Sequence, residues 1–198
     1  MKKGQPSKWD GCAYILKDGS GSMSGSKNLE ACKALAIIEH GIKETMPFKI
    51  TEFATSGDTV THRVIKNWKS NDVSKNYSWN FYNKFSPTGG NKDGYSIRVA
   101  TKELLRRGES QKLMIIISDG LPSAYESHTE GYSDVHSAVM EARKKGIFVI
   151  SIYIGEAEYI ESNKTNYEKM YEKDFIGATP ENLPKELSKI FKRFIKAY

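Results

Sequence analysis

Apolar runs of strand length alternate with helix-like segments along most of this chain. The first apolar run, at residues 12–16, predicts a strand, and the two most continuous runs, at 113–117 and 147–154, are typical of parallel strands buried on both faces at the centre of a sheet. Segments with helical spacing of apolar residues accompany them, at residues 26–44, 93–107 and 134–145. This alternation predicts βαβ units and therefore a mainly parallel central sheet with helices on both faces.

One pair of strands is expected to run antiparallel. Residues 48–53 and 59–66 both have strand character, and a short turn containing Ser56-Gly57-Asp58 joins them. That connection is too short for a parallel crossover, so the two segments should form a hairpin whose second strand lies at the sheet edge. The expected fold class is α/β: a doubly wound, Rossmann-like three-layer sandwich with a mainly parallel sheet and one antiparallel edge strand.

The remaining segments are less regular. Residues 67–85 are rich in aromatic side chains, and Val73, Tyr77, Phe81 and Phe85 recur every four residues as on a helix. This segment predicts either core packing or an aromatic patch that faces a partner. Residues 156–173 are polar and predict only a short helix, whereas Thr179 followed by Pro180 predicts the start of a last helix.

Composition narrows the class of protein. The 198 residues, 38% hydrophobic and 27% charged, suit one domain at 10–198 after a flexible segment at 1–9. No apolar run approaches the roughly 20 residues that span a bilayer, and the N-terminus lacks an apolar signal core. Two cysteines, Cys12 and Cys32, do not make a disulfide framework, so a cytoplasmic protein with reduced thiols is expected.

The net charge of +6 could attract nucleic acid or an acidic partner. The basic residues are scattered, however, and the sequence contains no motif of a known nucleic-acid-binding module. Nucleic acid is therefore not an expected partner, and nothing in the sequence demands more than a monomer.

A cluster of oxygen-bearing side chains follows the first strand. In Asp18-Gly19-Ser20-Gly21-Ser22, one carboxylate and two hydroxyls occupy alternate positions, and the glycines let the backbone turn. Hard divalent cations prefer oxygen ligands, and alternate residues of a turning chain can surround one point. The strand at 113–117 ends in Ser118-Asp119, and the loop before the helix at 93–107 reads from Ser86 to Gly94. Ligands in open α/β sheets gather at such strand ends.

This arrangement resembles the metal-ion-dependent adhesion site, or MIDAS, of von Willebrand factor A (VWA) domains. The resemblance covers residues 10–196 and implies that Asp18, Ser20 and Ser22 bind the metal while Asp119 holds a metal-bound water. The family has a threonine in the remaining loop. Counting back six residues from Ile97 reaches Asn91, which we favour for that role, and Thr88 and Asp93 are alternatives. Lys17 is a second departure, because an apolar residue usually precedes the aspartate.

Two segments, at residues 91–98 and 117–122, resemble a narrower branch: the VWA modules of cobalt-chelatase subunits and nitric-oxide-reductase activation proteins. Those relatives carry long segments before the module, so we expect the chain to be either an excised or a stand-alone version of it. The resemblance implies a non-enzymatic protein-binding module that holds Mg²⁺ or Mn²⁺, with Ca²⁺ less suited. Its expected partner is a protein with an exposed acidic residue, in this branch a MoxR-type AAA+ ATPase.

Two enzyme classes are the alternatives. Gly19-x-Gly21-x-x-x-Gly25 between a strand and a helix could indicate a Rossmann-type nucleotide-binding enzyme, with Glu52 as the only ribose partner on the next strand. Asp18 and Asp119 could instead flank the cation of a metal-dependent phosphohydrolase. The sequence offers no P-loop, no Gly-x-Ser-x-Gly elbow and no evident nucleophile or general base, so the binding module is preferred.

Overall fold

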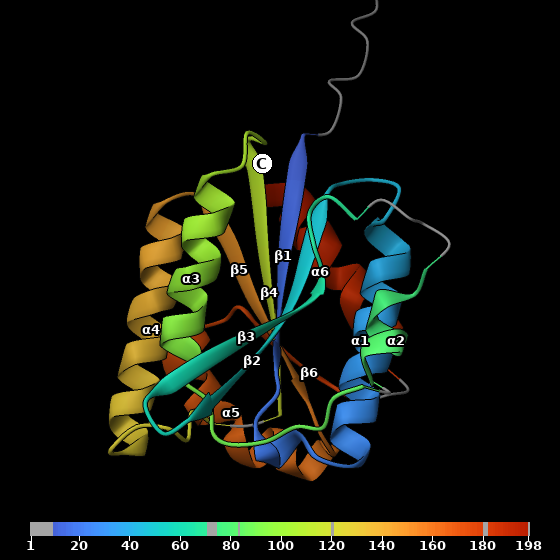
Figure 1. Cartoon of the computed structure of the whole chain (residues 1–198). Coiled ribbons are helices and arrows are strands. Elements are labelled where there is room, and N and C mark those ends of the chain that lie inside the picture. The colour runs from blue at the N-terminus through green and yellow to red at the C-terminus, as the bar shows by residue number, and fades with distance from the viewer. Residues whose placement is uncertain (1–9, 71–74, 83, 120, 180–181, 198) are drawn as a thin grey trace, which may run out of the picture.

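A six-stranded sheet in the order β3-β2-β1-β4-β5-β6 forms the middle layer of the molecule (Figure 1). The computed structural model describes residues 10–70, 75–82, 84–119, 121–179 and 182–197, so the expected flexible segment at 1–9 lies outside the described residues. The strands are β1 (Gly11–Asp18), β2 (Phe48–Ser56), β3 (Thr59–Lys66), β4 (Gln111–Ser118), β5 (Ile147–Ile154) and β6 (Phe175–Ala178). All neighbouring pairs are parallel except β2–β3, which confirms the antiparallel edge strand.

Helices cover both faces of this sheet, which confirms the three-layer α/β class (Figure 1). On one face lie α1 (Ser26–Ile42), α2 (Tyr77–Tyr82) and α6 (Leu183–Ala197). On the other lie α3 (Asp93–Leu105), α4 (His128–Lys144) and α5 (Ala157–Tyr171). A short 3₁₀ helix, η1 (Gly21–Met23), links β1 to α1.

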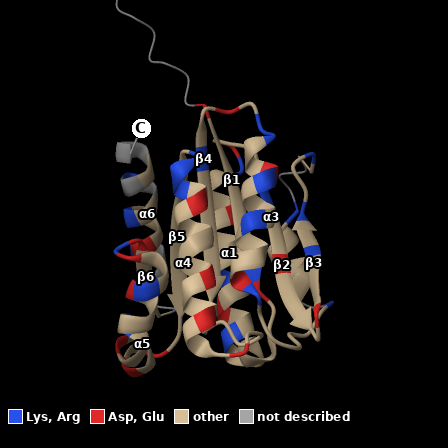
Figure 2. Ribbon diagram, turned by 90° about the vertical axis from the view of Figure 1, so that its left-hand side faces the viewer, with Lys and Arg blue, Asp and Glu red and all other residues tan. Residues whose placement is uncertain are grey.

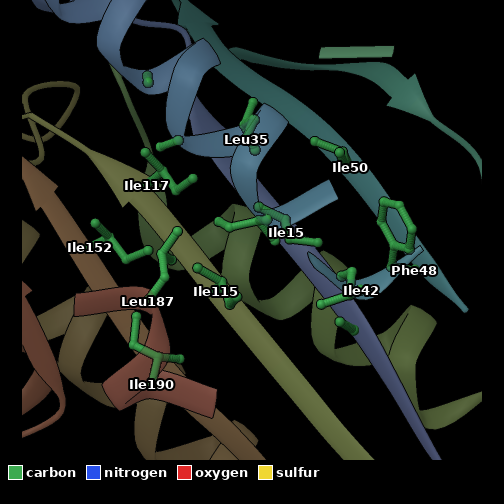
Figure 3. Close-up of a cluster of buried hydrophobic side chains, with 14 of the residues drawn as sticks. Ile15, Leu35, Ile42, Phe48, Ile50, Ile115, Ile117, Ile152, Leu187 and Ile190 are labelled. Atoms are coloured by element: carbon green, nitrogen blue, oxygen red, sulfur yellow. The ribbon is translucent and has the colours of Figure 1, made fainter. Parts of the chain in front are cut away.

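Each central strand contributes to two hydrophobic clusters because successive side chains point to opposite faces. In β1, Ile15 packs toward α1 and α6, and its neighbour Leu16 packs toward α3 and α4. Figure 3 shows the first cluster, where Ile15, Leu35 of α1 and Ile115 of β4 meet. The continuous apolar runs of β1, β4 and β5 are thus explained by burial on both faces.

Two elements differ from the sequence-based expectation. The prediction of only a short helix within residues 156–173 is wrong, because α5 is 15 residues long and buries Tyr167, Met170 and Tyr171. The strand that follows it, β6, was not expected at all, and it extends the sheet beyond β5. The polar sequence does not predict the full length of this helix, because its buried apolar residues are concentrated near its C-terminal end. Tertiary packing therefore decides the length of α5.

The observed helix boundaries also differ from the predicted ones. The helix expected at 134–145 begins earlier, at His128, since the Ser127 hydroxyl caps it by accepting from the Glu130 amide at 3.2 Å. The aromatic segment forms only the six-residue α2, and Val73 lies outside the described residues. The last helix begins at Leu183, whereas Pro180 lies outside the described residues.

Charges of both signs are interspersed over the outer surfaces of the helices (Figure 2). Arg98 of α3, for example, pairs with Asp134 at 2.7 Å and with Glu141 at 3.2 Å on α4. Within the described ranges, none of the helices combines the length and the hydropathy required to cross a bilayer.

Candidate metal centre

The candidate centre lies where β1 and β4 end side by side. Lys17 of β1 and Ile117 of β4 are paired in register, so Asp18 and Ser118, the last residues of the two strands, lie side by side at the edge of the sheet. The Ser118 hydroxyl donates to Asp18 Oδ2 at 3.0 Å. The chain runs from β1 to β2 on one side and reaches β4 on the other, and such a switch in strand order opens the usual binding crevice of an α/β sheet.

Hydrogen bonds join four oxygen-bearing residues in a line at this crevice. The Ser20 amide donates to Asp18 Oδ1 at 2.8 Å, and the hydroxyls of Ser20 and Ser22 lie 3.0 Å apart. The Ser22 hydroxyl in turn donates to Asp119 Oδ1 at 3.0 Å. The fifth residue that the sequence favours as a ligand, Asn91, also reaches this group, because its Nδ2 donates to Asp18 Oδ2 at 3.3 Å.

Asp18 is fully buried at the bottom of this line. Burial raises the pKa of the Asp18 carboxyl to about 6, opposed by the hydrogen bonds from Ser20 and reinforced by the charge of Asp119. A carboxylate that is costly to ionise in isolation is a site where a bound cation would be stabilising.

The loop before α3 packs against the same crevice. Gly89 has a φ of +72°, and a Cβ there would stand 2.2 Å from the Thr55 carbonyl oxygen, so only glycine fits. Its neighbour Gly90 exchanges backbone hydrogen bonds of 2.8 Å with Thr55, and the Gly89 carbonyl accepts from the Gly21 amide at 2.8 Å. These contacts hold the third loop against the turn that carries Ser20 and Ser22.

Asn91 is buried in this loop, but its side-chain oxygen is already engaged. Asn91 Oδ1 accepts from the Ser123 amide at 2.9 Å and from the Ser123 hydroxyl at 2.6 Å. Asn91 Nδ2 donates to Asp18 Oδ2 at 3.3 Å. Asn91 therefore orients the Asp18 carboxylate through its amide N–H group, and its amide oxygen links Asp18 to Ser123 in the loop after β4. The Thr88 side chain is exposed.

Asp93, the other alternative, is the first residue of α3 and is 3% exposed. Its Oδ2 atom is buried without a hydrogen-bond partner among the described residues. Burial, followed by the charge of Asp18, raises the pKa of Asp93 well above its usual range. An orphaned buried carboxylate oxygen beside Asp18 is the kind of group that a cation would satisfy.

Lys27 and Ser118 are members of the centre that sequence reasoning missed. The Lys27 ammonium, from the first turn of α1, forms an ion pair with Asp119 Oδ2. Ser118 could have been found from its place at the end of β4, directly before Asp119. Nothing in the spacing of Lys27 indicates its contact, because it depends on how a long side chain reaches across the crevice.

Lys17, the unusual residue before Asp18, is fully buried and belongs to an ion-pair network. Its ammonium donates to the Asp18 carbonyl at 3.0 Å and to Glu52 Oε2 at 2.7 Å. The other carboxylate oxygen, Glu52 Oε1, lies 3.2 Å from Arg63 Nε. The cation of Lys17 is thereby neutralised under the crevice. Glu52, the ribose partner of the nucleotide-binding alternative, is committed to this network.

The donor set fits a hard cation that uses hydroxyl as well as carboxylate oxygens. Within the described part of the chain, no group of three or more His, Cys, Asp or Glu side chains is arranged to hold a metal by itself. A cation at this crevice would therefore depend on Ser20 and Ser22 in addition to the carboxylates.

The strand order, the flanking helices and the crevice define the fold of VWA domains. The vWF domain of the type V pilus tip protein Mfa5 from Porphyromonas gingivalis superposes with a TM-score of 0.67 at 11% identity, over 94% of this chain and 95% of that one. The SpRpn10 VWA domain gives a TM-score of 0.62 at 13% identity, over 91% and 95%. The pilus adhesin SpaC from Lactobacillus rhamnosus GG gives 0.67 at 16% identity, over 97% of this chain and 30% of that one. These likenesses establish the fold.

Among sequences, the chain is similar to the uncharacterized protein YojO of Bacillus subtilis (strain 168). The two are 29% identical over 215 residues, which include 98% of this chain and 32% of that protein. The chain thus spans about a third of the length of this curated relative. No family model matches the chain.

Proposed function

We propose that this chain is a metal-ion-dependent protein-binding module of the VWA type. In this proposal a Mg²⁺ or Mn²⁺ ion at the β1–β4 crevice captures an acidic side chain of a partner protein. The single observation that carries the proposal is the line of hydrogen bonds that joins Asp18, Ser20, Ser22 and Asp119. The Ser20 backbone amide donates to Asp18 Oδ1, the hydroxyls of Ser20 and Ser22 are bonded to each other, and the Ser22 hydroxyl donates to Asp119 Oδ1. This line lies at a strand-order switch point, where this fold class places its ligands.

The proposed ligands are Asp18, Ser20 and Ser22, with Asp119 acting through a water molecule. For the third loop, the geometry favours Asp93 over Asn91, because Asp93 Oδ2 has no partner among the described residues whereas Asn91 Oδ1 accepts from Ser123. Thr88 remains an alternative, because its side chain is exposed, as is that of Ser22, and its amide donates to the Gly19 carbonyl at 2.8 Å. All of these donors are oxygens, which suits Mg²⁺ or Mn²⁺ and, with less advantage, Ca²⁺.

The chemistry of this donor set accounts for protein binding rather than catalysis. Neutral hydroxyls supply part of the coordination, so a bound cation would retain much of its positive charge and attract a carboxylate from outside. Ser22 is exposed at the mouth of the crevice, whereas Asp18 is buried at its base. A partner carboxylate would therefore approach from the side of Ser22.

The resemblance of residues 91–98 and 117–122 to the chelatase and nitric-oxide-reductase branch supports a MoxR-type AAA+ ATPase as the partner and the cytoplasm as the location. In the nucleotide-binding alternative, the loop after β1 would offer its amides to phosphate. Here the Gly19 amide donates to the Phe53 carbonyl and the Gly21 amide to the Gly89 carbonyl, both at 2.8 Å. These commitments favour the binding module over an enzyme.

The test is calorimetric titration of the metal-stripped protein with MgCl₂ and MnCl₂, beside Asp18→Asn and Asp58→Asn. Asp18→Asn removes the buried charge while retaining the side-chain shape, and Asp58→Asn removes an exposed carboxylate from the β2–β3 turn. We expect one saturable site in the wild type and in Asp58→Asn, and none in Asp18→Asn. Capture of a MoxR-type ATPase should follow the same pattern. Unchanged metal binding by a folded Asp18→Asn protein would refute the proposed centre.

A further inference from the structure

A lysine of this chain already supplies positive charge at the candidate centre. Lys27 Nζ contacts Asp119 Oδ2, and the other oxygen of that carboxylate accepts from Ser22 at 3.0 Å. Both oxygens of Asp119, which is 1% exposed, are therefore engaged by side chains of this chain. A divalent cation that recruits Asp119 would have to share this carboxylate with the ammonium or displace it.

The structure also offers a second position for the same ammonium. Glu30 lies three residues after Lys27 on α1, so the two side chains occupy neighbouring places on one helix face. Glu30 Oε1 accepts from Lys33 at 2.8 Å, whereas Glu30 Oε2 is buried and has no hydrogen-bond partner among the described residues. A vacant acceptor therefore stands within reach of a displaced Lys27.

A cavity of about 590 Å³ provides the space for this movement. It lies between the start of α1 and the β5–α5 connection, and its lining includes Lys27, Glu30 and Tyr159. The Lys27 ammonium stands 5.4 Å from the centroid of the Tyr159 ring, so its present position is the edge of this cavity. A swing from Asp119 to Glu30 needs rotation of one flexible side chain and no change in the backbone.

We propose that Lys27 is a tethered cation that competes with the metal for Asp119 and moves to Glu30 when the metal binds. The inference rests on the proposed metal centre and adds an internal regulator of its affinity. In the metal-free state Lys27 neutralises Asp119. In the metal-bound state it would remain as a second positive charge beside the open coordination position, where an acidic partner side chain would meet both cations.

The size of the effect follows from screening. Lys27 is 37% exposed, so its repulsion of a nearby divalent cation is weakened by solvent. We therefore expect removal of the ammonium to tighten Mg²⁺ binding by about tenfold, a moderate change for a half-exposed charge beside a buried carboxylate.

The experiment compares Lys27→Met with Lys189→Met by calorimetric titration of the whole chain with MgCl₂. The two variants lose the same charge, but Lys189 pairs with Glu186 within α6 and contacts neither Asp119 nor Glu30. We expect about tenfold tighter binding in Lys27→Met and a change of less than about twofold in Lys189→Met. Glu30→Gln should weaken binding by roughly threefold, because the displaced ammonium loses its anionic partner.

Thermal unfolding of the metal-free proteins supplies a readout that does not depend on the metal. Lys27→Met should lower the midpoint by about 2–4 °C because the buried Asp119 loses its counter-charge, whereas Lys189→Met, which removes a half-exposed pair on α6, should change it by less than about 1 °C. An unchanged midpoint in Lys27→Met would overturn the inference, as would equal Mg²⁺ affinity in the wild type and Lys27→Met. In that last case the metal centre itself would stand. Absence of Mg²⁺ binding in every variant would instead refute the metal centre, and the inference with it.

Discussion

At the scale of single residues, the candidate centre is a concentration of buried negative charge that the chain only partly neutralises. Asp18, Asp93 and Asp119 are each at most 3% exposed. Asp119 is paired with Lys27, whereas Asp18 relies on hydrogen bonds from Ser20, Ser118 and Asn91, and Asp93 has one oxygen without a partner. Buried carboxylates destabilise a fold unless they gain a cation or a proton, so this cluster is best explained by a function.

Asn91 provides the first prediction. Its side chain makes three hydrogen bonds that join Asp18 to Ser123, so Asn91→Ala removes a donor from the buried Asp18 carboxylate and frees the loop at Ser123 from its anchor. We expect the free energy of unfolding to fall by about 2–3 kcal/mol, measured by urea denaturation of the metal-free protein. Thr88→Ala is the control, because it truncates an exposed side chain of the same loop and should change stability by less than about 0.5 kcal/mol.

Asn91→Ala and a further variant, Asp93→Asn, together separate the two candidate ligands of the loop before α3. If Asp93 holds the cation, Asp93→Asn should weaken Mg²⁺ binding more than Asn91→Ala does. The opposite order would assign the ligand to Asn91, in agreement with the count back from Ile97. A loss of stability in Thr88→Ala equal to that in Asn91→Ala would contradict the assigned hydrogen bonds.

The ligand candidates could be predicted from the sequence because the end of an apolar run marks the end of a strand. Asp18 and Asp119 each end an apolar run, and runs of this kind become parallel neighbours whose ends meet. Lys27 and Ser123 could not be found in this way. Their contacts depend on the reach of a side chain and on the path of the loop after β4, and neither leaves a periodic signal.

At the scale of elements, the main departure from prediction is the pair α5 and β6. The apolar residues of α5 cluster near its end, and β6 has only four residues, so neither produces a strong pattern. Their formation depends on contact with each other and with β5. Tyr167 of α5 packs against Phe175 of β6, with ring centroids 5.6 Å apart, and Ile160 lies over Gly177.

Gly177 provides the second prediction. A Cβ at this position would stand 2.3 Å from Ile160 Cγ2, so Gly177→Ala forces α5 away from β6. We expect a loss of about 1–3 kcal/mol in the free energy of unfolding. Combining it with Ile160→Ala should cost less than the sum of the two single changes, since the smaller side chain removes the overlap. Urea denaturation of the four proteins measures this coupling.

Gly155→Ala is the matched control, because its nearest neighbours would lie 3.8 Å away, at ordinary contact distance. It is expected to change stability by less than about 0.5 kcal/mol. If Gly177→Ala behaves like Gly155→Ala, β6 does not pack under α5 as described. If the double variant shows no coupling, the loss arises from the strand itself and not from the contact with Ile160.

At the scale of the whole molecule, one sheet lies between two hydrophobic clusters, and its strands contribute side chains to both of them. β1 and β4 supply side chains to both clusters and also carry Asp18 and Ser118 at their ends. The crevice therefore depends on both faces at once. Loss of packing on either face would disturb the strands that position the candidate ligands, so the molecule should unfold as one unit.

Leu35 of α1 and Leu104 of α3 test this expectation from opposite faces. Both are fully buried, and they belong to different clusters. Each change to alanine should lower the free energy of unfolding by about 3 kcal/mol, the usual effect of a cavity left by leucine. The two losses should add to within about 0.5 kcal/mol, because the residues share no neighbour across the sheet. In urea, far-ultraviolet circular dichroism and tryptophan fluorescence should follow a single transition in both variants. Two separated transitions in either variant would mean that one face of the sheet can unfold while the other stays folded. The crevice would then not require packing on both faces.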